Sequence, residues 1–330
     1  MSVRTHSALA PLRIRAFRCQ WPADLATSWA FEMESLILGW YVLVETRSVL
    51  LLTVFASLQF IGTLIAPMFG VAGDRIGHRN LLCAMRGFYA TLAATLMTFS
   101  FLGVLTPVLV FVIGALMGLV RPSDIGMRAA LVADTMPPSQ LIGAMGIQRT
   151  TQDSARIAGA LTGAGLVAML GMAPAYVVIA SLYTTSVLLT LNAGRAREKR
   201  NAPIGPVAIT ARPTPWQDLR QGLAYVWSTP HLFAAMCLAF LLNMTVFPLS
   251  NGLLPYVAKE IYKTNQTGLG YMVAGVAFGA LLGSISLFRH GSVAHPARMM
   301  IIACAAWYSL LLVFAHVQVH LAGIFVLMLV

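Results

Sequence analysis

The chain has 330 residues, of which 58% are hydrophobic and 10% charged, and its formal net charge at pH 7 is +11. Its mean hydropathy of +0.78 exceeds what a soluble domain of this length needs for a core, so lipid is the expected solvent. The basic charge does not indicate a nucleic-acid partner, because Lys and Arg occupy the gaps between apolar runs and form no dense stripe.

The cysteines indicate neither a disulfide framework nor a metal site. They are scattered, without CxxC or Cys/His spacing, at Cys19, Cys83, Cys237 and Cys304. The first twenty residues are basic and lack the apolar stretch of a signal peptide, so we interpret them as a cytoplasmic lead-in. No metal or cofactor is expected.

Apolar runs long enough to cross a bilayer follow one another along the chain. A crossing helix needs about 20 apolar residues. The candidate runs are 22–44, 49–72, 81–105, 107–127, 141–170, 174–191, 232–257, 268–288, 299–315 and 319–330. Because the last run is too short to span, we expect the sequence to stop inside a helix.

Basic residues predict the orientation of these runs, because short loops rich in Lys and Arg stay in the cytoplasm. The N-terminus and alternate loops, including the loop assigned to Arg128, carry most of the Lys and Arg. The opposite set of loops holds Arg47, Lys259 and Lys263. A cytoplasmic N-terminus in a multi-pass protein of the bacterial cytoplasmic membrane is therefore predicted.

A basic linker rich in proline and small residues divides the chain into 1–192, 193–231 and 232–330. Inside it, Thr214 and Gln217 have the spacing of a capping box, and Pro215 suits the first helical position. A short amphipathic helix on the membrane surface is expected here. Its apolar face would carry Trp216, Leu219, Leu223 and Trp227.

The stretch GVAGDRIGHRN, residues 70–80, connects the second and third runs. It resembles the loop motif Gly-x-Leu-Ala-Asp-Arg-x-Gly-Arg-Lys of the major facilitator superfamily. The matching residues are Gly70, Asp74, Arg75, Gly77 and Arg79, whereas Ala72, Gly73 and His78 depart from the motif. A turn this short needs glycines for close approach and positive φ.

This resemblance implies an all-α membrane protein with two pseudo-symmetric six-helix bundles, of which the last two to three helices are incomplete or absent here. It also implies that Asp74 and Arg75 latch the two halves together in one state of a transporter. A solvated turn whose charges serve only topology is the simpler alternative. Residues 128–166, 219–232, 247–262 and 267–284 further resemble the exporter branch that includes the enterobactin exporter and related secretion transporters.

Ionisable residues within a membrane are costly and are functional candidates. In the first run, Asp24, Ser28, Glu32 and Ser35 follow helical spacing, whereas Glu34 lies about 200° around the helix from Glu32. Glu32, near mid-helix, is our candidate for the proton-carrying residue of a central cavity. A structural ion pair between Glu32 and an arginine of another helix is the alternative.

The fifth run carries Arg149, Asp153 and Arg156 on one predicted helix face, with both arginines in reach of the carboxylate. The fourth run carries Arg121 and Asp124 around Pro122, and an arginine in this helix is associated with proton coupling in similar antiporters. An ion-pair network joining these helices to the loop of Asp74 is the alternative, which we favour over direct substrate contact.

Small residues recur at helical spacing in two runs. GALTG, from Gly159 to Gly163, resembles the antiporter motif Gly-Pro-x-x-Gly without its proline, and Gly275, Gly279 and Gly283 recur every fourth residue. We interpret both as helix-packing seams. His316 and His320, four residues apart, could form a metal-binding pair, but no third ligand lies nearby in the sequence, so a metal site is not predicted.

Together these patterns predict a secondary active exporter, driven by protons, for small siderophore-like or drug-like amphipathic molecules. The expected partners are the substrate, protons and the lipid bilayer, and a monomer is the expected state. The open alternatives are an uptake facilitator or symporter of the same fold and a transport-inactive protein. A membrane enzyme is disfavoured because no nucleophile elbow, HExxH motif or Walker loop occurs.

Overall fold

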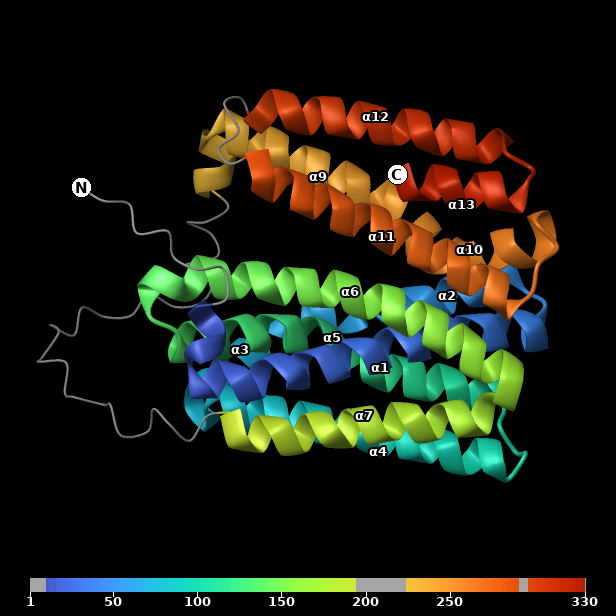
Figure 1. The fold of residues 1–330 in the computed structure, drawn as a ribbon, viewed down its shortest axis with the longest axis horizontal. Coiled ribbons are helices and arrows are strands. Elements are labelled where there is room, and N and C mark those ends of the chain that lie inside the picture. The colour runs from blue at the N-terminus through green and yellow to red at the C-terminus, as the bar shows by residue number, and fades with distance from the viewer. Residues whose placement is uncertain (1–9, 194–223, 291–295, 330) are drawn as a thin grey trace, which may run out of the picture.

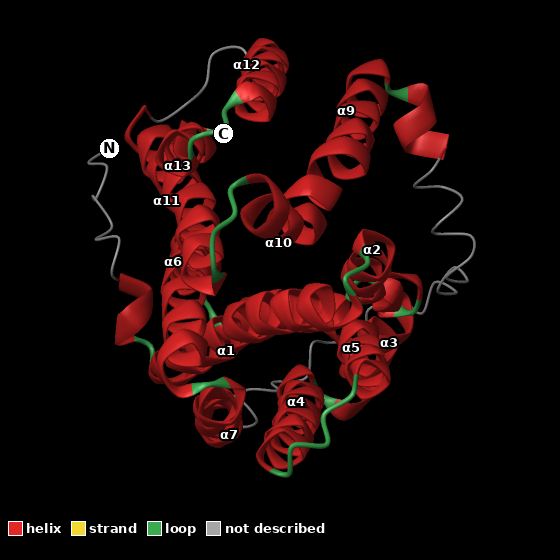
Figure 2. Cartoon of the chain, turned by 90° about the vertical axis from the view of Figure 1, so that its right-hand side faces the viewer, coloured by secondary structure: helices red, strands yellow, loops and turns green. Residues whose placement is uncertain are grey.

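The computed structural model describes residues 10–193, 224–290 and 296–329, and these residues form helices and connecting loops without a strand (Figures 1 and 2). The α-helices are α1 (Arg15–Thr46), α2 (Val49–Leu58), α3 (Ala66–Ile76), α4 (His78–Phe101), α5 (Pro107–Thr135), α6 (Pro138–Leu170), α7 (Met172–Ala193), α9 (Pro230–Pro248), α10 (Leu254–Tyr256), α11 (Gln266–His290), α12 (Pro296–His316) and α13 (His320–Leu329). There are also short 3-10 helices, η1 (Ala10–Arg13) and η2 (Ile61–Leu64), and π-helices, η3 (Leu249–Leu253) and η4 (Val257–Ile261), and residues 224–228 are helical as well.

Within the described residues, five helices are long and apolar enough to cross a membrane: α4, α5, α7, α11 and α12. The pair formed by residues 49–64 and α3 makes a sixth candidate span, bent by 49°. Helices α1 and α6 are longer, at 32 and 33 residues, but carry several ionisable side chains. An all-α, multi-pass membrane protein follows from these helices.

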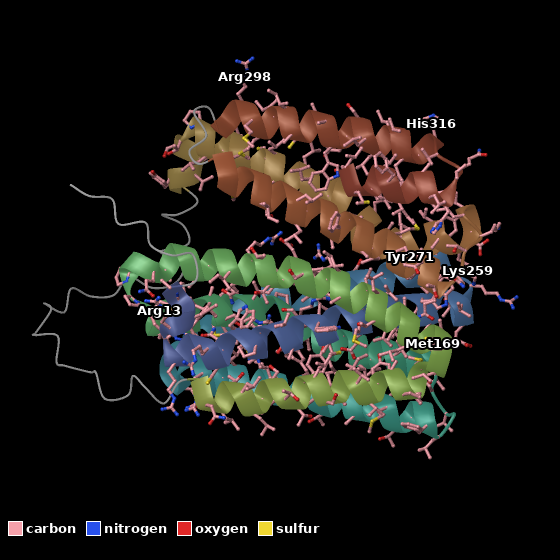
Figure 3. The ribbon with its side chains drawn as sticks, in the orientation of Figure 1. Arg13, Met169, Lys259, Tyr271, Arg298 and His316 are labelled. Atoms are coloured by element: carbon pink, nitrogen blue, oxygen red, sulfur yellow. The ribbon has the colours of Figure 1, made fainter. Side chains whose placement is uncertain are left out.

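Successive spans, with α2 and α3 counted as one bent span, run in opposite directions, so the connections between spans gather at two ends. We call one end the basic end; it holds η1 and the α3–α4 and α5–α6 turns. Arg13 and Arg298 lie there in Figure 3, and Met169, Lys259 and His316 lie at the other end, which we call the far end. Helix α1 begins at the basic end, and the cytoplasmic side predicted for its N-terminus stays a prediction.

The helices form an N-terminal group, α1 to α7, and a C-terminal group, α9 to α13, which lies above it in Figure 1. Aromatic and aliphatic side chains of α1, α4, α5 and α7 fill the core of the N-terminal group. Phe31, Tyr89 and Tyr183 lie at its centre, with ring centroids 5.5 to 6.4 Å apart. This packing makes α1 a central element.

The sequence predicted one straight helix over the run 49–72, but the structure breaks it into α2, η2 and α3. Pro67, at the start of α3, cannot donate the backbone hydrogen bond that would continue a helix. The break also presses against α5: a Cβ on Gly118 would lie 2.0 Å from the carbonyl oxygen of Leu58. A helix pair this close requires glycine, and the bend follows from these two features.

Two other boundaries also differ from prediction. The stretch 70–80 is helical through Ile76, and the turn narrows to Gly77, whose φ is +93°. Helix α5 continues to Thr135, so Arg128 lies inside a helix and not in a loop.

Of the predicted amphipathic helix, Trp216, Leu219 and Leu223 lie outside the described residues. Trp227 is exposed, 5.1 Å from the ring of Phe233.

Candidate functional site

A buried cluster of opposite charges, which we call the charge cluster, lies among the N-terminal helices. It consists of Asp24, Arg86, Asp124 and Arg128, whose side chains are at most 4% exposed. Arg86 donates to Asp24, and Arg128 Nη2 lies 2.5 Å from Asp124 Oδ2 and its Nε 3.9 Å from Asp24 Oδ1. Two carboxylates and two guanidinium groups balance one another, as buried charges require.

Polar side chains of two further helices complete this cluster. Gln148 of α6 donates to Asp24 at 3.2 Å, and Arg86 donates to Thr190 of α7. Arg128 also donates to Ser28 Oγ at 2.7 Å. The charge cluster therefore joins α1, α4, α5, α6 and α7. Asp24 and Asp124 were expected to face a cavity; the structure encloses them, because the arginines hold them among five helices.

Glu34 occupies a second buried site, nearer the middle of α1. Tyr183 donates its hydroxyl to Glu34 Oε2 at 2.9 Å, while Oε1 is buried with no hydrogen bond to the described residues. A cavity of about 20 Å³, room for about one water molecule, lies beside it. The cavity is lined by Phe31, Glu34, Ser35, Leu38, Phe55, Gln59, Gly114, Met117, Gly118 and Arg121.

Arg121 links this cavity to the break in the α2–α3 span. It donates to Gln59 Oε1, and its guanidinium carbon lies 3.9 Å from the centre of the Phe31 ring. Ser35 Oγ donates to the same Gln59 oxygen at 3.3 Å. Arg121 and Asp124, three residues apart in α5, thus belong to different sites, because Arg121 reaches Gln59 and Phe31 whereas Asp124 pairs with Arg128.

Glu32 faces α6 and pairs with Arg156, with 3.5 Å between Oε1 and Nε. Arg149 pairs with Asp153, with 3.4 Å between Nε and Oδ2. The predicted convergence of both arginines on Asp153 is therefore not what the structure shows. Arg156 instead reaches across to α1 and pairs there with the Glu32 carboxylate. The ion pair considered as an alternative role for Glu32 is present.

Helix α6 packs on α1 through two of the predicted glycines. A Cβ on Gly159 would lie 2.6 Å from Glu32 Cβ, and a Cβ on Gly163 would lie 3.0 Å from Met33 Cα. In α11, Gly275 and Gly279 contact Ile324 and Met328 of α13. The place of a Cβ on Gly283 has no described atom within 4 Å, so the seam ends one turn earlier than predicted.

The two groups of helices meet through an apolar interface near the far end. It joins Leu36 of α1 and Ala160 and Ala164 of α6 to Leu254, Val257 and Leu269. A Cβ on Gly270 of α11 would lie 3.0 Å from the carbonyl oxygen of Ala160. Helices α6 and α11 converge toward this end in Figure 1 and separate toward the basic end.

At the α3–α4 turn, His78 holds the end of α5. Its Nδ1 lies 2.7 Å from Asp134 Oδ2, and its Nε2 lies 3.5 Å from Asp74 Oδ1. Arg79 donates to the carbonyl oxygens of Thr190 and Leu191 at the end of α7. The side chain of Asp74 is 79% exposed. These contacts all lie within the N-terminal group.

Gly73, not Gly70, provides the close approach at this turn. A Cβ on Gly73 would lie 2.9 Å from Met127 Sδ, whereas a Cβ on Gly70 would meet no described atom within 4 Å. Arg75 is exposed, and no ion pair of this residue occurs among the described residues. The latch role expected for Asp74 and Arg75 stays a prediction.

Comparison with known protein families identifies the chain. The family model described as transmembrane secretion effector matches residues 6–330. The chain belongs to this family, within the major facilitator superfamily. It is therefore a multi-pass membrane protein of a transporter family. No curated protein matches the chain.

In this transmembrane secretion effector, sequence reasoning missed Arg86, Arg128 and Glu34 as site residues. Arg86 is isolated inside an apolar run, and that isolation is the signal that could have identified it as a candidate. Arg128 follows Asp124 by four residues, a helical pairing distance that the misplaced loop boundary concealed. Glu34 was set aside because it faces away from Glu32, although that direction leads into the core.

The structure brings together no metal-binding group in the part of the chain that it describes. No cluster of three or more His, Cys, Asp or Glu side chains occurs there. His316 Nδ1 lies 2.8 Å from the carbonyl oxygen of Leu312, and His320 Nε2 lies 3.3 Å from that of Gly268. Both histidines are thus engaged by backbone groups.

Proposed function

We propose that this chain is a proton-coupled exporter of small amphipathic molecules in the bacterial cytoplasmic membrane, with the basic end in the cytoplasm. Siderophore-like and drug-like compounds are the substrate classes we propose to test. The chain acts as a monomer, and export proceeds by alternating access, in which two helical groups rock around a central binding site.

The observation that carries this proposal is that α11 buries one face of α6 near the far end and leaves the same face exposed nearer the basic end. Near the far end, Ala160 and Ala164 of this face are buried against α11. Nearer the basic end, Met145 and Arg149 of the same helix are exposed. Two groups closed at one end and separated at the other have the geometry of one of the two states that alternating access requires.

Glu32 is the first candidate for the proton site. It lies one helical turn from Leu36, at the edge of the apolar interface, and its pairing with Arg156 leaves it 19% exposed. Protonation of Glu32 would release Arg156 and so change the contact between α1 and α6. One charge crossing 100 mV supplies about 2.3 kcal/mol, enough to drive a substrate gradient of tens-fold.

Glu34 is the second candidate, supported by its burial and its single hydroxyl donor. Burying an ionised carboxylate without a paired cation is costly, so a site of this kind suits a group that gains and loses a proton. Arg121, Arg149, Asp153, Arg156, Asp24 and Asp124 are the remaining coupling candidates. The enclosure of Asp24 and Asp124 favours a structural role for that pair.

The test is substrate-driven proton movement in inverted membrane vesicles, followed with a pH-sensitive dye across siderophores and lipophilic cations. The variants are Glu32→Gln and Glu34→Gln, with Glu45→Gln, exposed at the far end, as control. Loss in Glu32→Gln alone supports Glu32 as the proton site. Loss in Glu34→Gln alone moves the site to Glu34. No proton movement in the inserted, folded wild type contradicts proton-coupled export.

A further inference from the structure

A row of ionisable side chains on α6 points toward the C-terminal group of helices. With about 100° of rotation per residue, Arg149, Asp153 and Arg156 lie within about 40° of the direction of Ala160. Ala160 faces α11, because a Cβ on Gly270 of that helix would lie 3.0 Å from its carbonyl oxygen. The row therefore continues the contact face of α6 into the part that α11 leaves uncovered.

Among the side chains of this row and Glu32 of α1, which pairs with Arg156, the arginines are more exposed to solvent than the carboxylates. The side chains of Arg149 and Arg156 are 65% and 40% exposed, whereas those of Asp153 and Glu32 are 4% and 19% exposed. The carboxylates lie behind the guanidinium groups that pair with them. A ligand that enters between the two groups of helices thus meets hydrogen-bond donors with positive charge first.

The C-terminal group offers no charge of its own at this depth. The sequence has no Asp, Glu, Lys or Arg in 231–258, 264–288 or 299–315, which cover the membrane-spanning parts of α9, α11 and α12. Its charged residues Lys259, Glu260 and Lys263 lie near the far end, where Lys263 pairs with Glu260, and Arg298 lies at the basic end. The two groups thus present unlike surfaces, one with accessible arginines and one apolar.

We propose that Arg149 and Arg156 bind the anionic group of an amphipathic substrate, a carboxylate or a comparable oxyanion, while the C-terminal helices contact its apolar part. This inference rests on the proposed transport function and specifies its substrate class. Arginine suits the task because its planar guanidinium group donates two parallel hydrogen bonds to a carboxylate. A lipophilic cation would find both nearby carboxylates already paired and shielded.

Direct binding to the purified full chain in phosphatidylcholine nanodiscs tests the inference. The probes are two dansyl-labelled undecyl chains, one ending in a carboxylate and one in a trimethylammonium group, with empty nanodiscs subtracted. We expect the wild type to bind the anionic probe at least tenfold more tightly. The double variant Arg149→Gln, Arg156→Gln should reduce this preference to within twofold. The double Lys variant should retain an intermediate preference.

The matched control removes two positive charges from the far end, by Lys259→Gln and Lys263→Gln, and should leave the preference unchanged. Equal binding of both probes by the wild type would overturn the inference, as would a preference retained by the double Gln variant at an unchanged melting temperature. Flux of the anionic probe in vesicles is measured separately. Absent flux with a retained binding preference would contradict the transport function while supporting the arginine site.

Discussion

At the residue scale, several side chains from different N-terminal helices interact with the single buried carboxylate of Asp24. Its carboxylate accepts from Arg86 and Gln148 and lies 3.9 Å from Arg128. Removing one member of a buried charge group leaves its partners unpaired, which costs about 3–5 kcal/mol. Exposed charges contribute far less, because water screens them.

We therefore expect Asp24→Asn to lower the stability of the purified protein by about 3–5 kcal/mol, because Arg86 and Arg128 lose a shared counter-charge. The measurement is the melting temperature in detergent. Asp74→Asn is the matched control, since the Asp74 side chain is 79% exposed, and should change the melting temperature little. Equal shifts for the two variants would contradict the structural role of the charge cluster.

Two tyrosines of α7 allow a sharper comparison. Both are fully buried, but the hydroxyl of Tyr183 donates to Glu34 and that of Tyr176 has no partner among the described residues. We expect Tyr183→Phe to destabilise the protein by about 1–3 kcal/mol, because a buried acceptor loses its donor. Tyr176→Phe should be neutral or slightly stabilising. Thermal unfolding of both variants is the measurement, and a larger loss of stability for Tyr176→Phe would contradict the hydrogen bond between Tyr183 and Glu34.

At the element scale, the bent α2–α3 span depends on glycines of its neighbour α5. We expect Gly118→Ala to destabilise the protein by about 1–3 kcal/mol, because its Cβ would overlap the backbone at Leu58. Gly126→Ala, in the same helix, meets no described atom within 4 Å and should be neutral or stabilising, since alanine favours helix. Melting temperatures of both variants are the test. Unchanged stability of Gly118→Ala would show that α2 and α5 are farther apart.

Sequence alone predicted the straight spans well because their apolar length is a local property. Helices α4, α7, α11 and α12 fall within a few residues of the predicted runs. The bend after α2 escaped prediction because its local signal, Pro67, was overlooked and because Gly118 matters only once α5 lies against Leu58, a contact between distant residues. Likewise, Arg128 looked like a loop residue because its charge is tolerated in a helix only when Asp24 and Asp124 surround it.

The site was less predictable than the helices for the same reason. Spacing placed Arg149, Asp153 and Arg156 on one face of α6, and the ion pair between Arg149 and Asp153 agrees with that placement. Spacing could not show that Arg156 would pair with Glu32 of another helix. Pairing across helices depends on their rotation and separation, which the contacts of Gly159 and Gly163 with α1 define.

At the scale of the whole molecule, the two groups of helices meet at the far end, where α10 packs against α1. A Cβ on Gly39 of α1 would lie 3.7 Å from Pro255 Cγ of α10. This contact is at the far end, within the apolar interface that holds Leu36 and Leu254. Opening of the far end during alternating access must separate these two residues.

A cross-link between positions 39 and 255 should therefore stop transport. In a background without Cys19, Cys83, Cys237 and Cys304, all free in the structure, the changes are Gly39→Cys and Pro255→Cys. We expect substrate-driven proton movement in vesicles to fall at least tenfold on linking with a short, cleavable bis-thiosulfonate and to recover on reduction. The physical reason is that a closed far end cannot release substrate.

The matched control links two positions of the N-terminal group at the same end, by Tyr41→Cys and Leu105→Cys. The hydroxyl of Tyr41 in α1 donates to the carbonyl oxygen of Leu105 in the α4–α5 loop at 3.1 Å, so these two parts of the N-terminal group move together if the groups rock as rigid units. This link should leave transport within twofold of the unlinked protein. Arrest by both links would indicate that movement within the N-terminal group is required. Unchanged transport with positions 39 and 255 linked would rule out opening of the far end at α10.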